Sequence, residues 1–281
     1  MRSLLFVPGD DPRKLEKSLS SEADALIFDL EDSVGADRKA EARAITREAL
    51  RASTAKTRLV RLNPFETGLL HDDLQSVLAA QPDGLVLPKA RTPLDVRRLA
   101  RLLDQAGVDP ACSIVAIASE TPAAVQSLAR DDWRCPRLSG LMWGAEDLAA
   151  ELGASRNRVQ GRPTQPFALA RNLLLVAAKA AGVQAIDTIY ADFRDVTGLE
   201  AEASEAAADG FDAKAAIHPG QLDAINKAFQ PSEDALDWAR QVVEIMSSGS
   251  TGVASLKGQM LDQPHLKQAK RLLERAGYRN E

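Results

Sequence analysis

Two carboxylates directly follow apolar runs that have the composition of buried strands. Glu120 follows the run at residues 114–119, and Asp147 follows the run at residues 138–143, after Gly144 and a second acid. The turns that leave the carboxyl ends of parallel strands carry the chemistry of α/β folds. Two carboxylates at such an edge suit Mg²⁺, which takes one or two of them and leaves its other positions to water and substrate oxygens.

A second explanation of Glu120 and Asp147 uses no metal. Acids in the first turn of a helix cap free amide groups and are stabilised by the helix dipole. Helix signals follow both acids, with Thr121-Pro122 after the first and an apolar helical pattern after the second. Spacing alone leaves both explanations open.

Further polar residues lie at the ends of other predicted strands. They are Asp29, Glu31 and Asp32 at the end of the strand at 25–30, Arg61 and Asn63 at the end of 58–62, Lys89 after 84–87, and His218 after 213–217. Any one of them alone fits a helix cap or a hydrogen-bonded rim residue. Together they predict an acid-rich mouth with one arginine.

A metal on Glu120 and Asp147, with Arg61 opposite, would bind a 2-oxo or 2-hydroxy carboxylate. The guanidinium would grip the carboxylate with two parallel hydrogen bonds. The cation would polarise the neighbouring oxygen and stabilise an enolate.

Lys89 suggests a rival mechanism, that of a Schiff-base aldolase. Such a lysine must lose its proton, whereas the acids predicted around it would keep it charged, so we favour the metal. His218 has the side chain of a general base or a metal ligand. Its place between Ile217 and Pro219 favours a hydrogen-bonded structural role instead.

Short apolar runs alternate with amphipathic stretches along most of the chain. Eight strands are predicted, at residues 3–7, 25–30, 58–62, 84–87, 114–119, 138–143, 185–190 and 213–217. A helical stretch follows each strand, and Thr92-Pro93 is a typical cap and first position for one of them. This order predicts a (β/α)8 barrel. No G-x-G-x-x-G turn follows any of the runs, which disfavours an open doubly wound sheet.

The residues after the eighth unit form an extension. A helix is predicted at 232–246, followed by a Ser/Gly-rich stretch at 247–252, an ordered-looking segment and a final helix. We therefore predict a catalytic barrel at 1–230 and a C-terminal helix, flap and final helix at 231–281. The Ser/Gly-rich linkage favours a hinged flap, and a packed appendage without a catalytic part is the alternative.

Composition excludes several classes of function. The 281 residues include 35 Lys and Arg against 40 Asp and Glu, a net charge of −5, without a long basic block, so nucleic acid is not the expected partner. No apolar run reaches membrane-spanning length or has the features of a signal peptide. Cys112 and Cys135 show neither metal-ligand spacing nor a disulfide framework. We expect a cytoplasmic protein that acts on a small molecule.

Several motifs, in order along the barrel, resemble those of the citrate lyase beta-subunit-like family in the HpcH/HpaI aldolase superfamily. They are RSLLFVPG at 2–9, DLEDSV at 29–34, RLN at 61–63, VLPK at 86–89, GAEDL at 144–148 and IHPGQ at 217–221. The resemblance implies a (β/α)8 barrel that uses Mg²⁺. It raises the metal explanation above capping.

The resemblance also implies roles for individual residues. Glu120 and Asp147 would be metal ligands, Glu120 also lying against the substrate, and Arg61 would bind the substrate carboxylate. Glu31 and Asp32 would hold metal-bound water as part of the catalytic set. The implied contacts to a CoA moiety lie around Arg2, Phe6, Arg13 and Lys14.

The segment at 258–267 is similar to the C-terminal segment of malyl-CoA and citramalyl-CoA lyases. In those enzymes an aspartate on a mobile flap enters a neighbouring subunit's active site and takes part in acid/base chemistry. Asp262 matches that position. The resemblance therefore implies a homo-oligomer, a trimer or a hexamer.

The predicted function is Mg²⁺-dependent carbon–carbon cleavage of a 3-hydroxy-3-carboxyacyl-CoA. Examples are (S)-citramalyl-CoA and malyl-CoA, which would give acetyl-CoA with pyruvate or glyoxylate. Two alternatives remain: a citrate lyase beta-subunit-type lyase that acts on a citryl thioester with an acyl carrier, and a non-catalytic relative that binds CoA thioesters. The sequence does not choose the substrate, because one methyl group changes binding only modestly.

Overall fold

The computed structural model describes residues 1–248, 254–256 and 258–278. Within them, eight parallel strands close into a barrel in the order β1-β10-β9-β6-β5-β4-β3-β2. The predicted (β/α)8 fold is confirmed. The strands are β1 (Ser3–Pro8), β2 (Ala25–Asp29), β3 (Thr57–Arg61), β4 (Gly84–Leu87), β5 (Ser113–Ile117), β6 (Leu138–Met142), β9 (Gln184–Asp187) and β10 (Ala213–Ala216).

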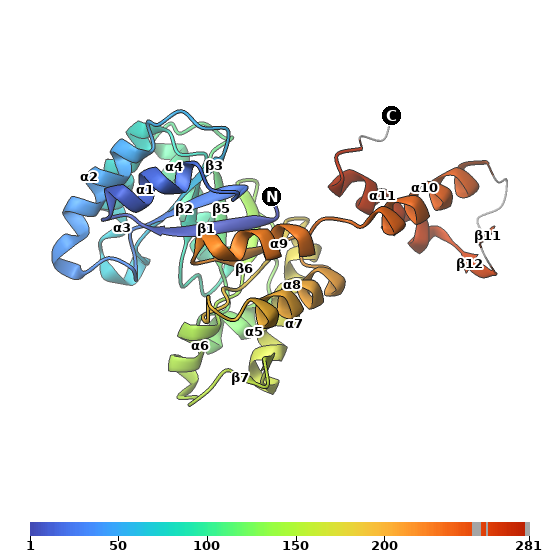
Figure 1. The fold of residues 1–281 in the computed structure, drawn as a ribbon. Helices are drawn as coiled ribbons and strands as arrows, with labels where there is room; N and C mark the ends of the chain where they lie inside the picture. The colour runs from blue at the N-terminus through green and yellow to red at the C-terminus, as the bar shows by residue number, and fades with distance from the viewer. Residues whose placement is uncertain (249–253, 257, 279–281) are drawn as a thin grey trace. The chain divides into compact units, whose positions relative to one another are not determined.

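Helices connect these strands and cover the outside of the barrel (Figure 1). They are α1 (Pro12–Leu19), α2 (Lys39–Ala49), α3 (Leu70–Val77), α4 (Pro93–Gln105), α5 (Pro122–Arg130), α6 (Ala145–Leu152), α7 (Gln165–Ala181), α8 (Val196–Asp209) and α9 (Leu222–Ala228). The predicted cap of α4 is confirmed, since the Thr92 side chain accepts a hydrogen bond from the Leu94 backbone. The helices α1, α4 and α5 begin with proline, which has no amide hydrogen to leave unbonded at the first helical position.

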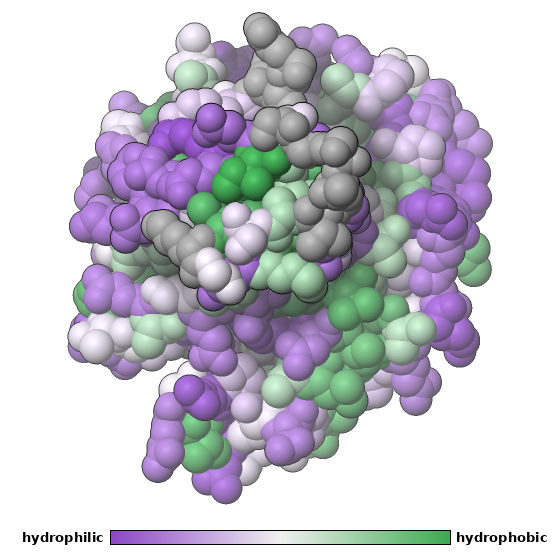
Figure 2. Space-filling view, turned by 90° about the vertical axis from the view of Figure 1, so that its right-hand side faces the viewer, coloured by the Kyte–Doolittle hydropathy of each residue, from purple (hydrophilic) through white to green (hydrophobic). Residues whose placement is uncertain are grey.

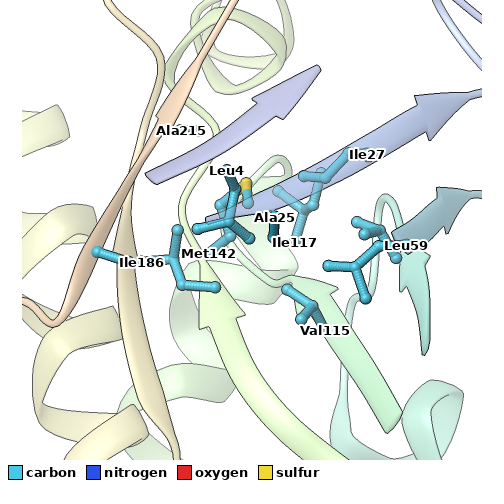
Figure 3. Packing of buried hydrophobic residues seen from close by; sticks show 11 residues of the cluster. Leu4, Ala25, Ile27, Leu59, Val115, Ile117, Met142, Ile186 and Ala215 are labelled. Atoms are coloured by element: carbon cyan, nitrogen blue, oxygen red, sulfur yellow. The ribbon is translucent and has the colours of Figure 1, made fainter. Parts of the chain in front are cut away.

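The barrel interior is filled by alternate residues of the strands (Figure 3). Leu4, Ile27, Leu59 and Ile186 are among its members, and each is at most 1% exposed. Because strand side chains alternate between faces, the intervening residues pack outward against the helices. The interior is therefore a solid core, and a ligand can enter only at an end of the barrel.

A short hairpin between β6 and β9 differs from the loop expected there. It pairs β7 (Arg158–Val159) with β8 (Arg162–Pro163) through Gln160 and Gly161, whose φ angles are 51° and 76°. Positive φ at both central residues is typical of the two-residue turns that join antiparallel strands. Two-residue strands are too short to produce a hydrophobic period, so no periodic pattern predicts them.

The chain divides into two compact units, Met1–Asn226 and Lys227–Glu281. The second contains α10 (Glu233–Ser248), a hairpin of β11 (Ala254–Leu256) with β12 (Gln259–Leu261), and α11 (Gln263–Arg275). Its own small core includes Val242, Leu261 and Ala269. Most of the Ser/Gly-rich stretch on which the hinge prediction rests lies outside the described residues.

The surface in Figure 2 is mostly hydrophilic, with separate hydrophobic patches. Among the helices of the described residues, none is long and apolar enough to cross a bilayer.

Candidate active site

A cavity of about 350 Å³ lies where the inward-facing positions of the strands reach the carboxyl end of the barrel. We call it the carboxyl-end pocket. Asp29 and Arg61 each lie two residues after a core residue of the barrel interior, so the strand period turns both side chains inward. The lining includes five of the predicted site residues: Phe6, Asp32, Arg61, Glu120 and Asp147.

Glu120 is a deeply buried carboxylate of the pocket, at 2% exposed. Its Oε2 accepts a hydrogen bond from the Lys89 backbone at 2.5 Å, and no ion pair to it forms among the described residues. Burial, with the nearby charges of Asp147 and Glu31, raises its pKa well above the usual range. A buried carboxylate without a counter-ion requires either a proton or a cation.

Gly144 makes room for Glu120. A Cβ at this position would lie 2.7 Å from Glu120 Cγ, closer than real carbon atoms approach. The glycine before the two acids is therefore a packing requirement of the buried carboxylate, in addition to being the residue that precedes α6.

The capping explanation of the two acids does not describe this geometry. Thr121 is the residue that caps α5, where it accepts a hydrogen bond from the Ala124 backbone. Asp147 lies in the first turn of α6, and its Oδ1 lies 3.1 Å from Lys89 Nζ. Neither carboxylate accepts a capping hydrogen bond in the described part of the chain, although the dipole of α6 still favours the charge of Asp147.

Arg61 already forms a bidentate ion pair with a carboxylate of the protein. Its Nε and Nη2 donate to the two oxygens of Asp29 at 2.6 and 2.7 Å, and its guanidinium lies 4.8 Å from the ring centre of Phe6. Burial opposes ionisation of Asp29, but Arg61 outweighs it and lowers the pKa of that carboxyl. Asp29 thus occupies one edge of the guanidinium, and a substrate could approach only the Nη1 side, which faces Glu31. This ion pair was not predicted from the sequence, although Asp29 and Arg61 are register partners on neighbouring strands.

Glu31 lies between the two cations of the site. Lys89 Nζ donates to its Oε1 at 2.6 Å, and Arg61 Nη1 lies 2.9 Å from its Oε2 without forming a hydrogen bond. Burial raises the pKa of Glu31 to about 7, even though both cations act in the opposite direction.

Lys89 stays protonated in this setting. Burial lowers the pKa of its ammonium, but Glu31, Glu120 and Asp147 outweigh burial and raise it. The acids therefore keep the lysine charged, as the sequence argument expected, and this weighs against a Schiff-base mechanism.

Other predicted residues lie elsewhere. Arg2 precedes β1 and is bonded through its backbone and guanidinium to Asp24, which precedes β2, so it lies at the opposite end of the barrel from the pocket. That position separates Arg2 from any ligand of the carboxyl-end pocket. Arg13 and Lys14 lie in the first turn of α1, after the carboxyl end of β1, and are not part of the pocket lining.

His218 and Asn63 have structural partners. His218 Nδ1 accepts a hydrogen bond from the Gly220 backbone, and its ring stacks on Phe193 with the centroids 4.9 Å apart. Asn63 is buried and donates through its backbone and side chain to Asp73. The structural role favoured for His218 agrees with these contacts.

Asp262 belongs to the second compact unit, where it precedes α11. Its Oδ1 lies 2.5 Å from His265 Nδ1, and its side chain is 37% exposed. The expected contact with a neighbouring subunit stays a prediction.

The donor set fits a magnesium ion with few protein ligands. No group of three or more His, Cys, Asp and Glu side chains able to hold a metal occurs within residues 1–248, 254–256 and 258–278. Mg²⁺ needs fewer, because it binds through one or two carboxylates and keeps several waters. Glu120, buried without a counter-ion, and Asp147 beside it match that requirement.

Comparison with known proteins agrees with this site. Residues 2–219 match the family model described as HpcH/HpaI aldolase/citrate lyase, and residues 168–278 match one described as C-C bond lyase of the TIM-barrel fold. A citrate lyase subunit beta-like protein of Mycobacterium tuberculosis is 36% identical over 97% of this chain and 94% of its own. The mitochondrial citramalyl-CoA lyase of Mus musculus is 33% identical over 97% of this chain and 85% of its own.

Among solved structures, the protein CitE of Mycobacterium tuberculosis in complex with magnesium, acetoacetate and coenzyme A is similar to this chain. The TM-score is 0.81 and the identity 35%, over 99% of this chain and 98% of the other. That neighbour contains the metal for which Glu120 and Asp147 have suitable chemistry.

Proposed function

Because the chain belongs to the HpcH/HpaI aldolase/citrate lyase family, whose members include lyases, we propose that it cleaves a carbon–carbon bond in a CoA thioester. The proposed substrate is a 3-hydroxy-3-carboxyacyl-CoA such as (S)-citramalyl-CoA or malyl-CoA. The products are then acetyl-CoA and pyruvate or glyoxylate. The observation that carries this proposal is the buried carboxylate of Glu120, which faces a pocket beside Asp147 and forms no ion pair within the described residues.

Glu120 and Asp147 are the proposed holders of Mg²⁺, which when bound supplies Lewis-acid polarisation of the substrate's hydroxyl and carboxylate oxygens. Arg61 orients the substrate carboxylate from its Nη1 side, where the ion pair with Glu31 forms no hydrogen bond, because Asp29 holds the other edge of the guanidinium. A residue that is itself held in place in this way positions a substrate without first having to become ordered.

Proton movement completes the cleavage. The hydroxyl proton leaves, the carbon–carbon bond breaks, and its electron pair passes to the thioester part as the enolate of acetyl-CoA. Glu31, with a pKa of about 7, can exchange a proton near neutral pH and is the candidate to receive the hydroxyl proton through a water held with Asp32. Asp262 of a neighbouring copy is the candidate donor to the enolate carbon.

The test is to incubate the purified protein with (S)-citramalyl-CoA and with malyl-CoA, each with Mg²⁺ and with EDTA, and to measure pyruvate or glyoxylate. Turnover of one thioester that EDTA abolishes supports the proposal and identifies the substrate. Turnover of citryl carrier thioesters alone favours the citrate lyase beta-type alternative. Binding of CoA thioesters, detected as thermal stabilisation, without any turnover favours a non-catalytic relative.

A further inference from the structure

Lys89 contacts both proposed metal ligands, one at each end of the residue. Its backbone amide donates to Glu120 at 2.5 Å, and its Nζ lies 3.1 Å from Asp147 Oδ1. The residue adopts a left-handed conformation, with φ of 50°, which is unfavourable for any residue with a side chain. Such a conformation persists where the surrounding structure holds it, and here two contacts fix both ends of the residue.

The same ammonium is shared with acids that the proposal does not assign as metal ligands. Lys89 Nζ lies 2.6 Å from Glu31 and 3.7 Å from Asp32. Its side chain is 30% exposed, so water screens only part of its charge. The ammonium therefore has one contact with a proposed ligand, Asp147, and a shorter contact with Glu31.

We propose that Lys89 is the built-in counter-ion of the metal-free site, a residue whose ammonium pairs with Asp147 until Mg²⁺ displaces it. This inference rests on the proposed function, because it presupposes that Glu120 and Asp147 bind the metal. With Mg²⁺ bound, the metal would neutralise the charge of Asp147, and repulsion between the two cations would move the ammonium away. Glu31 retains the ammonium nearby, because their contact is independent of the ligands.

The sign of the effect on metal affinity follows from this competition. Metal binding must break the ion pair between Lys89 and Asp147, and the free energy lost there weakens binding. The positive charge that remains near the site also repels the metal. Removing the ammonium should therefore tighten Mg²⁺ binding. A lysine that merely held Asp147 in place for the metal would give the opposite sign, since its loss would weaken binding.

The experiment is a calorimetric Mg²⁺ titration of the full-length protein and its Lys89→Met variant. Methionine keeps the length of the stem and the backbone amide that bonds Glu120, but it carries no charge. We expect the Mg²⁺ dissociation constant to fall by about five- to tenfold, within the usual range for coupled sites. An unchanged or larger dissociation constant in the variant overturns the inference.

Lys179→Met is the matched control. Lys179 is 33% exposed and pairs with Asp212 at 2.5 Å, away from the carboxyl-end pocket. Its substitution should leave the Mg²⁺ dissociation constant unchanged. If the unsubstituted protein itself binds no Mg²⁺, the proposed function fails at its metal site, a result distinct from equal binding by the protein and its Lys89 variant.

Thermal unfolding provides a second measurement. In EDTA, Lys89→Met should unfold at a lower temperature than the unsubstituted protein, because several acids lose a shared counter-ion. Saturating Mg²⁺ should raise the melting temperature of this variant more than that of the unsubstituted protein, by linkage. A purely structural loss would lower both melting temperatures equally. Lys89→Gln gives the same test if the methionine variant does not fold.

Discussion

At the scale of single residues, the site depends on a buried acid that has a backbone partner but forms no ion pair with any described residue. Glu120 is enclosed by Gly144 on one side and the Lys89 backbone on the other. The nearby guanidinium of Arg61 does not neutralise Glu120, because it already pairs with Asp29 and Glu31. The chemistry of the pocket is therefore set by which acids have a protein counter-ion and which do not.

Gly144→Ala should weaken metal binding. The added Cβ would meet Glu120 Cγ at 2.7 Å, so the carboxylate or the start of α6 must shift, at a stability cost of about 1–3 kcal/mol. Calorimetric titration with Mg²⁺ should show a larger dissociation constant. Gly35→Ala is the control, since its Cβ would meet only the end of the Asp37 side chain. Equal metal affinity in both variants would contradict the proposed role of Glu120.

Glu31 should give the metal-free protein a distinctive pH dependence. Its pKa, raised by burial to about 7 from an ordinary 4.5, means that the folded state binds more protons than the unfolded state between these values. The free energy of unfolding should therefore fall as pH rises through this window, by roughly 3 kcal/mol at most from Glu31. Urea unfolding in EDTA at several pH values checks this. Glu31→Gln should flatten the decline without abolishing it, because Glu120 acts in the same direction. A rise in stability across the window would contradict the assignment.

At the scale of elements, a buried ionic network lies behind the wall of the barrel and joins strands and helices around the pocket. Lys214 of β10 donates to Asp187, to the Thr188 carbonyl and to Glu202 of α8, each within 2.8 Å. Asp187 also accepts a hydrogen bond from the Trp143 indole at 2.6 Å. Because Trp143 and Thr188 line the carboxyl-end pocket, the network fixes part of the pocket wall from outside.

Lys214→Met should be strongly destabilising. The side chain is fully buried, and its loss leaves Asp187 and Glu202 without their shared ammonium, at a cost of roughly 3–5 kcal/mol. Urea unfolding should show a lower midpoint. Lys179→Met, at a partly exposed ion pair, should cost less than about 1 kcal/mol. Similar losses in the two variants would mean that the network is not a cooperative unit.

At the scale of the whole molecule, the residues of the proposed mechanism are divided between two compact units. The acids and the arginine belong to Met1–Asn226, whereas Asp262 belongs to Lys227–Glu281. If cleavage uses the pocket residues together with Asp262, a unit formed by residues 227–281 must reach the pocket. The proposed homo-oligomer supplies it from a neighbouring copy.

Subunit mixing tests this division. Asp147→Ala should abolish Mg²⁺-dependent turnover, and Asp262→Asn should lower it while leaving Mg²⁺ binding unchanged. When the two variants are mixed and allowed to exchange subunits, sites with an intact pocket and a neighbour's intact Asp262 should form. Recovery of about a quarter of the unsubstituted activity is then expected from random pairing. A mixture no more active than its components would mean that Asp262 does not act across subunits.

The sequence was sufficient for the eight strands, the closed barrel and the set of polar residues at the strand ends, because period, turn residues and strand-helix alternation are local properties. The ends of the strands were predicted less accurately. The seventh strand, expected at 185–190, is Gln184–Asp187, because Thr188 and Ile189 leave the sheet and line the pocket. The two-residue strands of the hairpin β7–β8 were missed for the same lack of local signal.

Only the tertiary structure decided which charges meet. Asp29 and Arg61 are 32 residues apart, and Glu31 and Lys89 are 58 apart, so their pairing depends on strand order and register. Strand order and register also place Arg2 at the end of the barrel opposite the pocket and Lys89 in contact with both proposed metal ligands. A sequence specifies which side chains a strand end offers, whereas the ion pairs follow from where neighbouring strands place them and from the burial that makes each pairing necessary.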